Sequence, residues 1–180
     1  YAMDYGSGST AYDSAGNNDG STTGTWVDGI RGSGLSLRGD QVTIQDSASL
    51  SGQTQLTIST WVKTTGSGPV ISKGIGKVGN REWELYIAGN GKATAIVAEE
   101  SANTVISAQS AASVNDGTWT HLAMTYDGSD LRLFVDGSQV ATTSTSLTID
   151  DGNADVTIAG AVDSDVIYAT VDEPRIYGSA

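Results

Sequence analysis

Apolar and polar residues alternate with a period of two through most of the chain, and this alternation restricts the fold more than any other feature of the sequence. It is clearest in residues 56–63 (LTISTWVK), 83–87 (WELYI), 119–126 (WTHLAMTY) and 131–136 (LRLFVD). Successive side chains of a β-strand point to opposite faces, so this period is typical of a strand with one buried face. No segment has the period of an amphipathic helix, about 3.6 residues. The sequence therefore predicts an all-β protein.

Turn dipeptides separate these segments at short intervals. Asn90-Gly91, Asp127-Gly128 and Asp136-Gly137 each lie between two alternating segments. Asn, Asp and Gly adopt the positive φ angles that tight hairpins need, so each dipeptide predicts a turn between antiparallel strands. This spacing implies about eleven to thirteen strands, enough for two packed sheets. We expect a two-sheet antiparallel β-sandwich, and the length of 180 residues is that of one domain, residues 1–180.

Charge and composition exclude several classes of function. The net charge is −12, whereas proteins that bind nucleic acid neutralise phosphates with clustered Lys and Arg, so nucleic acid is not an expected partner. The chain has no cysteine and one histidine, His121, which argues against disulfides, multi-histidine zinc sites and His-based triads. It also has no apolar run of the length that spans a bilayer, about 18 residues, so we expect no membrane insertion by this segment.

The kind of charge points to a salty environment. Asp supplies 16 of the 21 acidic residues, and Lys occurs only four times. At molar salt the Debye length falls to about 3 Å, so a large like-charge excess costs little folding energy. We interpret the composition as halophilic, with an ordinary acidic secreted domain as the alternative.

Several stretches, taken in order, resemble the laminin G-like branch of the concanavalin A-like lectin/glucanase superfamily. They cover residues 13–20 (DSAGNNDG), 34–44 (GLSLRGDQVTI), 56–63, 70–74 (VISKG), 119–137 and 171–177 (VDEPRIY). The resemblance implies a single jelly-roll domain that is secreted or displayed on a cell or virion surface. Pro174 stands where the family usually has an aliphatic residue. Because proline lacks an N–H for the sheet, we expect Pro174 at an edge or a bulge.

The resemblance also implies a structural Ca²⁺ between the first loop and the last strand. Calcium takes six to eight oxygen ligands, and the loop at 13–20 contains two Asp and two Asn. Asp13 and Asp172 would hold the ion, and Asn18 and Asp19 would supply further oxygens. The alternative is a polar turn with hydrogen bonds from Asx side chains. A second acidic cluster, at 150–151 and 163–165, is either another cation site or solvated surface.

Glu82 and Glu84 are candidate catalytic acids, because related folds include glycoside hydrolases with alternating acids on one strand. Retaining enzymes place two carboxyls about 5–5.5 Å apart, whereas residues two apart on a strand lie about 6.5–7 Å apart. The third alternating acid of those enzymes is also missing, since Tyr86 follows. We therefore expect no enzyme. Tyr86 with Glu84 is the better candidate for a sugar platform, the alternative being a buried or loop-supporting aromatic.

The leading function is a recognition module that binds carbohydrate or a surface glycoprotein. The alternatives are a self-assembling structural subunit of a surface layer, filament or viral appendage, and a glycoside hydrolase or lyase. Trp61 and Trp119 are predicted to be core anchors, and His121 is predicted to be structural. The step from resemblance to function is an analogy, because one fold hosts many functions.

The halophilic interpretation predicts that salt stabilises the protein well beyond the range that screens charge. The reason is the net charge of −12, carried mainly by Asp. Thermal unfolding from sub-molar to multi-molar sodium chloride measures the effect, and the midpoint should rise throughout. A midpoint that stays flat or falls would contradict the interpretation.

Overall fold

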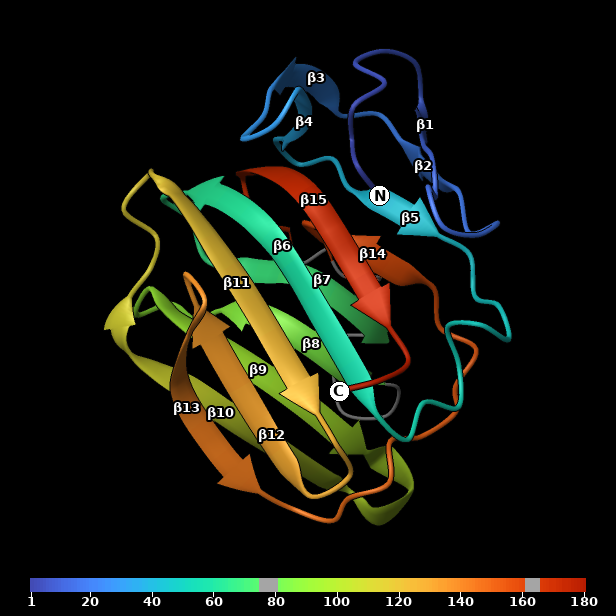
Figure 1. Cartoon of the computed structure of the whole chain (residues 1–180), viewed down its shortest axis with the longest axis vertical. Coiled ribbons are helices and arrows are strands. Elements are labelled where there is room, and N and C mark those ends of the chain that lie inside the picture. Colours follow the sequence, from blue (N-terminus) through green and yellow to red (C-terminus); the bar gives the residue numbers. More distant parts are fainter. Residues whose placement is uncertain (75–80, 161–165) are drawn as a thin grey trace.

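Two antiparallel sheets pack face to face, with the seven-stranded sheet in front in Figure 1. The structure is a computed structural model that describes residues 1–74, 81–160 and 166–180. The eight-stranded sheet has the order β1 (Thr10–Ala11), β2 (Gly20–Thr22), β5 (Val42–Ile44), β14 (Val156–Ile158), β7 (Gly68–Gly74), β8 (Arg81–Ile87), β9 (Lys92–Glu99) and β10 (Thr104–Ser113). The seven-stranded sheet has the order β13 (Ser138–Ser144), β12 (Asp130–Val135), β11 (Trp119–Tyr126), β6 (Leu56–Thr64), β15 (Ala169–Tyr177), β4 (Ser33–Leu37) and β3 (Thr25–Asp28).

The predicted all-β sandwich is confirmed, and so are its turns. Gly91, Gly128 and Gly137 all have positive φ, and they lie in the turns β8–β9, β11–β12 and β12–β13. The described residues form fifteen strands, more than expected, because the weakly patterned first 44 residues contribute five short ones. One 3₁₀ turn, η1 (Glu100–Ala102), follows β9. Within the described ranges, no helix is long and apolar enough to cross a membrane.

The core lies between the sheets and follows the predicted alternation. In β6, Leu56, Ile58 and Val62 are buried while Trp61 is partly exposed. The prediction that Trp61 and Trp119 are core anchors is therefore wrong. Both tryptophans alternate in step with the polar residues of their strands, so they lie on the outer face of the seven-stranded sheet. Trp83 of β8, in contrast, is in the core.

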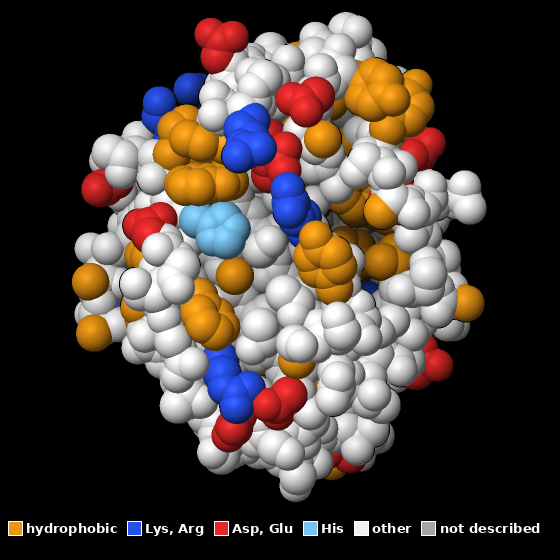
Figure 2. All heavy atoms as spheres, viewed as in Figure 1, with side chains coloured by type: hydrophobic (Ala, Val, Ile, Leu, Met, Phe, Trp, Pro, Cys, Tyr) orange, Lys and Arg blue, Asp and Glu red, His pale blue; other side chains and the backbone are white. Residues whose placement is uncertain are grey.

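That outer face carries aromatic and basic side chains in an otherwise acidic protein. Figure 2 shows orange hydrophobic and blue basic groups over β6, β11 and β15, around the single histidine in pale blue. The ring of His121 meets Trp61 edge-on, with 5.2 Å between ring centroids. Burial lowers the pKa of His121, which favours its neutral form.

A bulge interrupts β15 between Asp172 and Arg175, and it contains Pro174, as the sequence predicts. Glu173 within the bulge has a φ of 51°. Because a bulge adds a residue to one strand, it changes which side chains face outward beyond it. Arg175 and Tyr177 consequently lie on the outer, accessible side of the last strand.

Asp172 is fully buried beside this bulge and anchors the β3–β4 loop. Its Oδ2 accepts the N–H groups of Ile30 (2.9 Å) and Arg31 (3.0 Å), and its Oδ1 accepts that of Glu173 (2.8 Å). A Cβ on Gly29 would lie only 2.5 Å from Oδ2, so this loop approaches the carboxylate as closely as glycine allows. Asp172 is thus a structural acceptor for backbone donors.

Candidate functional site

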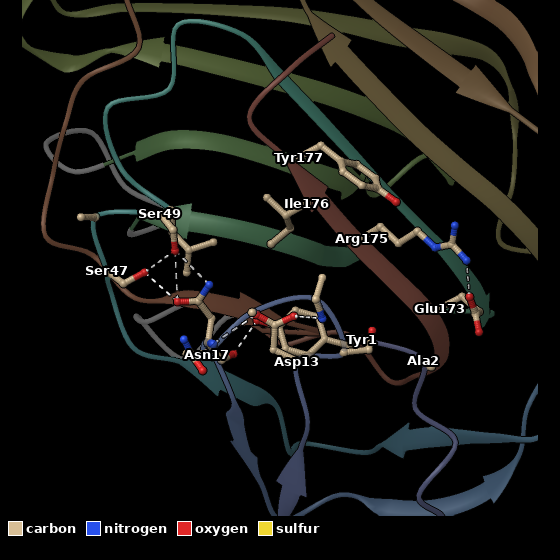
Figure 3. A pocket seen from close by; sticks show the side chains of 16 residues that line it. Tyr1, Ala2, Asp13, Asn17, Ser47, Ser49, Glu173, Arg175, Ile176 and Tyr177 are labelled. Atoms are coloured by element: carbon tan, nitrogen blue, oxygen red, sulfur yellow. Dashed lines mark hydrogen bonds and ion pairs between the residues drawn. The ribbon is translucent and has the colours of Figure 1, made fainter.

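An open groove of about 760 Å³ lies where the β1–β2 loop, the β5–β6 loop and the second half of β15 meet (Figure 3). Its lining combines hydroxyl, amide, carboxylate and guanidinium groups with two tyrosines. The lining residues are 1–2, 13–18, 47–50, 173 and 175–177. A concave site with converging polar groups and an aromatic surface is the usual form of a small-ligand site.

The β1–β2 loop forms one wall and is shaped by its own aspartates. Asp13 accepts the N–H groups of Ala15 (3.0 Å) and Asn18 (3.1 Å), and the N–H of Asp13 donates to Asp19 (2.8 Å). Desolvation opposes ionisation of Asp13, but these N–H donors outweigh it and hold its pKa below the ordinary value. Asp13 therefore presents a carboxylate, an acceptor for hydroxyl donors, at the groove.

Asn18 joins this loop to the β5–β6 loop. Its Nδ2 donates to Ser49 Oγ at 3.0 Å, and its Oδ1 accepts the hydroxyl of Ser47 at 2.7 Å. The hydroxyl of Tyr1 donates to the carbonyl of Asn18 at 2.6 Å. Figure 3 shows Ser47, Ser49 and Asn17 on this side of the groove. The two loops therefore form one hydrogen-bonded wall.

The opposite wall is the bulged half of β15. Arg175 forms an ion pair with Glu173 at 2.5 Å, and its side chain is about half exposed. Glu173 and Tyr177 both hold the pKa of Arg175 above its ordinary value, so its charge is fixed. Tyr177 is 48% exposed, and it offers an aromatic surface beside these polar groups.

A buried ammonium group in the eight-stranded sheet holds the β5–β6 loop in place. Lys73 of β7 is fully buried, and its Nζ lies 2.7 Å from Asp46 Oδ1 and 3.1 Å from Glu82 Oε1. It also donates to the carbonyls of Ala154 (2.8 Å) and Gly152 (3.4 Å) in the β13–β14 loop. Asp46 belongs to the β5–β6 loop, so one cation ties two loops to the eight-stranded sheet.

Glu82 titrates abnormally in this cluster. Burial raises its pKa to about 7, against the opposing influence of Lys73, while Asp46 adds to the rise. Asp46, hydrogen-bonded by Lys73 and Ser51, has a lowered pKa despite its desolvation. Lys73 therefore pairs chiefly with Asp46 below neutral pH, where Glu82 is protonated.

The four predicted calcium ligands do not form one donor set in this structure. Asp13, Asn18 and Asp19 share the β1–β2 loop, but Asp172 contacts the β3–β4 loop instead. The carboxylate of Asp172 is buried and already accepts three N–H groups, so it does not fit a metal ligand here. Among the described residues, no three acidic, histidine or cysteine side chains gather at a point that could hold a metal ion. The loop has the hydrogen bonds of a polar turn closed by Asp side chains, and its calcium site stays a prediction.

Glu84 and Tyr86, the predicted sugar platform, lie outside the groove. Glu84 has a side chain only 4% exposed and pairs with Arg81 at 3.5 Å, and Tyr86 is partly buried. As a ligand site this pair stays a prediction. Glu82 and Glu84 each face a separate cation, Lys73 and Arg81. In the second acidic cluster, Asp150 accepts the N–H and hydroxyl of Ser101, whereas positions 163–165 lie outside the described residues.

Most of the groove residues carry no signal in the sequence. Ser47 and Ser49 belong to a segment that carries no motif. Arg175 and Tyr177 lie in the family-like stretch 171–177, but nothing in that stretch marks them as ligand-binding residues. The four residues meet only through the pairing of distant strands. The one available signal was Pro174: a bulge at that position changes the facing of every later residue in β15. The Asn-rich first loop, which the sequence predicts as a metal site, forms one wall of the groove.

Comparison with known proteins establishes the family. A family model, Laminin_G_3, described as concanavalin A-like lectin/glucanases superfamily, matches residues 36–180. The chain belongs to this family, and the resemblance in the sequence is confirmed. No curated protein sequence matches the chain.

Solved structures with the same fold share little sequence with it. The binding domain of Paraclostridial Mosquitocidal Protein 1 aligns with a TM-score of 0.73 and 16% identity, over 95% of this chain and 48% of that one. Domain 4 of AbnA, a GH43 extracellular arabinanase from Geobacillus stearothermophilus in complex with arabinotriose, gives 0.72 and 20%, over 92% and 85%. Mouse laminin alpha1 domains LG4-5 give 0.57 and 20%, over 72% and 37%. The chain thus spans about half of the first of these proteins, and likeness at these identities shows the fold alone.

The raised pKa of Glu82 predicts a pH dependence of folding that Glu82→Gln removes. Because the folded pKa, about 7, lies above the ordinary 4.5, the stability from protonated Glu82 is present below pH 4.5 and is lost as pH rises through 7. Relative to the variant, the free energy of unfolding of the wild type should fall by up to about 3 kcal/mol between pH 4.5 and pH 7. Urea unfolding of both proteins at several pH values measures it. A wild-type-minus-variant difference that is the same at every pH would contradict the assignment.

Proposed function

We propose that this domain is an extracellular recognition module that binds carbohydrate or a glycoprotein glycan in the groove. The observation that carries the proposal is the exposed ring of Tyr177 beside Arg175, Asp13 and Asn17 in one hollow. A sugar presents an apolar C–H face and a rim of hydroxyls, which match an aromatic surface flanked by charged and amide groups.

The structural neighbours support a binding role. Two of them are the binding domain of Paraclostridial Mosquitocidal Protein 1 and an arabinanase domain in complex with arabinotriose. A third is the binding domain of a botulinum neurotoxin in complex with SialylT, with a TM-score of 0.65 and 12% identity. A binding module without its own catalysis also agrees with the separate pairing of Glu82 and Glu84. We extend the proposal to an extracellular setting of high salt, on the strength of the net charge of −12.

Two further predictions stay open beside this proposal. One is a structural calcium ion, for which the family resemblance implies Asp13, Asn18, Asp19 and Asp172; in this structure the carboxylate of Asp172 accepts three backbone N–H groups. Self-assembly as a structural subunit is the alternative function, and it needs no sugar at the groove. Glycan binding measured with and without calcium tests the first, and light scattering of the same protein tests the second.

The proposal predicts that Tyr177→Ala weakens glycan binding without affecting the fold. An array of oligosaccharides that includes arabinotriose, read with and without calcium, selects the ligand, and calorimetry then compares variants. Loss of the aromatic surface should weaken binding about tenfold, or about 1.4 kcal/mol. Tyr5→Ala is the matched control, because Tyr5 is also exposed, at 67%, but lies outside the groove.

Two outcomes would contradict the groove assignment. One is a Tyr177→Ala variant that binds the selected glycan as tightly as Tyr5→Ala does. The other is a protein that binds no oligosaccharide on the array but associates with itself in light scattering, which would favour the structural-subunit alternative.

A further inference from the structure

A second hollow lies where β4, β6 and β15 meet, on a different part of the seven-stranded sheet from the groove. Its volume is about 300 Å³, and its lining includes Ser36, Arg38, Lys63, Thr65, Tyr168 and Thr170. We call these six residues the cationic pocket. None of them lines the groove.

Strand pairing places the polar side chains of the pocket in one row. Thr170 of β15 pairs with Ser36 of β4 on one side and with Lys63 of β6 on the other. Each of the three lies between buried strand neighbours, so all three side chains face outward. Trp119 of β11 pairs with Lys63 on its other side and is partly exposed on the same face. The register therefore builds a rigid surface rather than a loop tip.

The two cations of this pocket differ from Arg132 and Arg175, the other basic residues on the strands of this sheet. Arg132 is paired with Asp127 and Asp130, and Arg175 is paired with Glu173. Arg38 and Lys63 are exposed, and within the described part of the chain neither forms an ion pair. In a protein of net charge −12, two like charges at one hollow repel each other and contribute nothing evident to folding. Their placement calls for an anionic partner.

The rest of the lining suits a sugar that carries such an anion. Tyr168 is 62% exposed and lies over Gly39, where an added Cβ would be 3.8 Å from its ring. Its ring offers an apolar surface, while hydroxyls of Ser36, Thr65 and Thr170 can donate to or accept from sugar hydroxyls. A guanidinium group binds a carboxylate or sulfate through two parallel N–H donors, and the lysine ammonium adds a point charge.

We propose that the cationic pocket binds the carboxylate or sulfate group of an acidic saccharide, with Arg38 and Lys63 on the anion and Tyr168 against the ring. The site is separate from the groove, so this assignment stands or falls independently of the proposed function. A polyanion such as nucleic acid is disfavoured by the overall charge, whereas a short saccharide needs only the local contacts. At high salt the long-range repulsion is screened, and the charge-assisted hydrogen bonds at contact remain.

The test compares matched charged and uncharged ligands on the full chain. Calorimetry measures tri-galacturonic acid against its methyl ester, which differs only in the carboxylates, and a sulfated oligosaccharide against its desulfated form. The first pair tests a carboxylate source and the second a sulfate source. At least one charged ligand should bind ten or more times as tightly as its uncharged partner.

Variants then locate the binding. Arg38→Gln and Lys63→Gln should each weaken binding of the charged ligand about tenfold or more, while Lys92→Gln, on the other sheet, should not. Tyr177→Ala in the groove should leave this binding unchanged, which separates the two sites. All three Gln variants should retain the wild-type melting temperature, because these side chains lie outside the core.

Three results would overturn the proposal. They are equal binding of charged and uncharged ligands in both pairs, binding that Lys63→Gln and Lys92→Gln reduce alike, and binding of the charged ligand that Tyr177→Ala abolishes.

Discussion

The buried ammonium group of Lys73 is the interaction on which the candidate site most depends. Removing a charge from water costs several kcal/mol, and only good geometry with several partners offsets that cost. Lys73 has such partners: two carboxylates and two backbone carbonyls, contributed by β8 and by the loops that precede β6 and β14. Loss of this cation would leave Asp46 and Glu82 facing each other without a counter-charge.

A continuous path of contacts leads from this cation to the rim of the groove. Asp46 holds the base of the β5–β6 loop, and Ser47 and Ser49 of that loop form hydrogen bonds with Asn18 of the β1–β2 loop. A wall fixed before the ligand arrives spares the entropy of ordering it on binding. On the other side, the bulge at Pro174 turns Arg175 and Tyr177 toward the groove, and Asp172 holds that bulge to the β3–β4 loop. Two buried charged groups therefore support the two sides of the site.

Local pattern in the sequence was enough to predict the sheets, but long-range contacts determine the site. The alternation around Leu56 correctly predicted a strand with one buried face, and Asp136-Gly137 correctly predicted a turn. Both depend only on local properties, the direction of side chains along a strand and the geometry of a turn. The same alternation puts Trp61 in step with Thr57, Ser59 and Lys63, so it should have placed Trp61 on the outer face. In the sequence, nothing distinguishes Lys73 from an ordinary solvent-exposed lysine. Its partner Asp46 lies 27 positions away, and only the pairing of β5, β14 and β7 brings the two together.

Amide hydrogen exchange on Lys73→Met tests most directly whether this cation organises the site. The account predicts faster exchange in the β5–β6 and β13–β14 loops, and unchanged exchange in β11 and β12, which belong to the other sheet. Asp46→Asn, which keeps the shape and removes one charge, should reproduce the effect more weakly if Lys73→Met does not fold. Arg132→Met, which removes two partly exposed ion pairs, is the control. Wild-type exchange in both loops of both cluster variants would contradict the account.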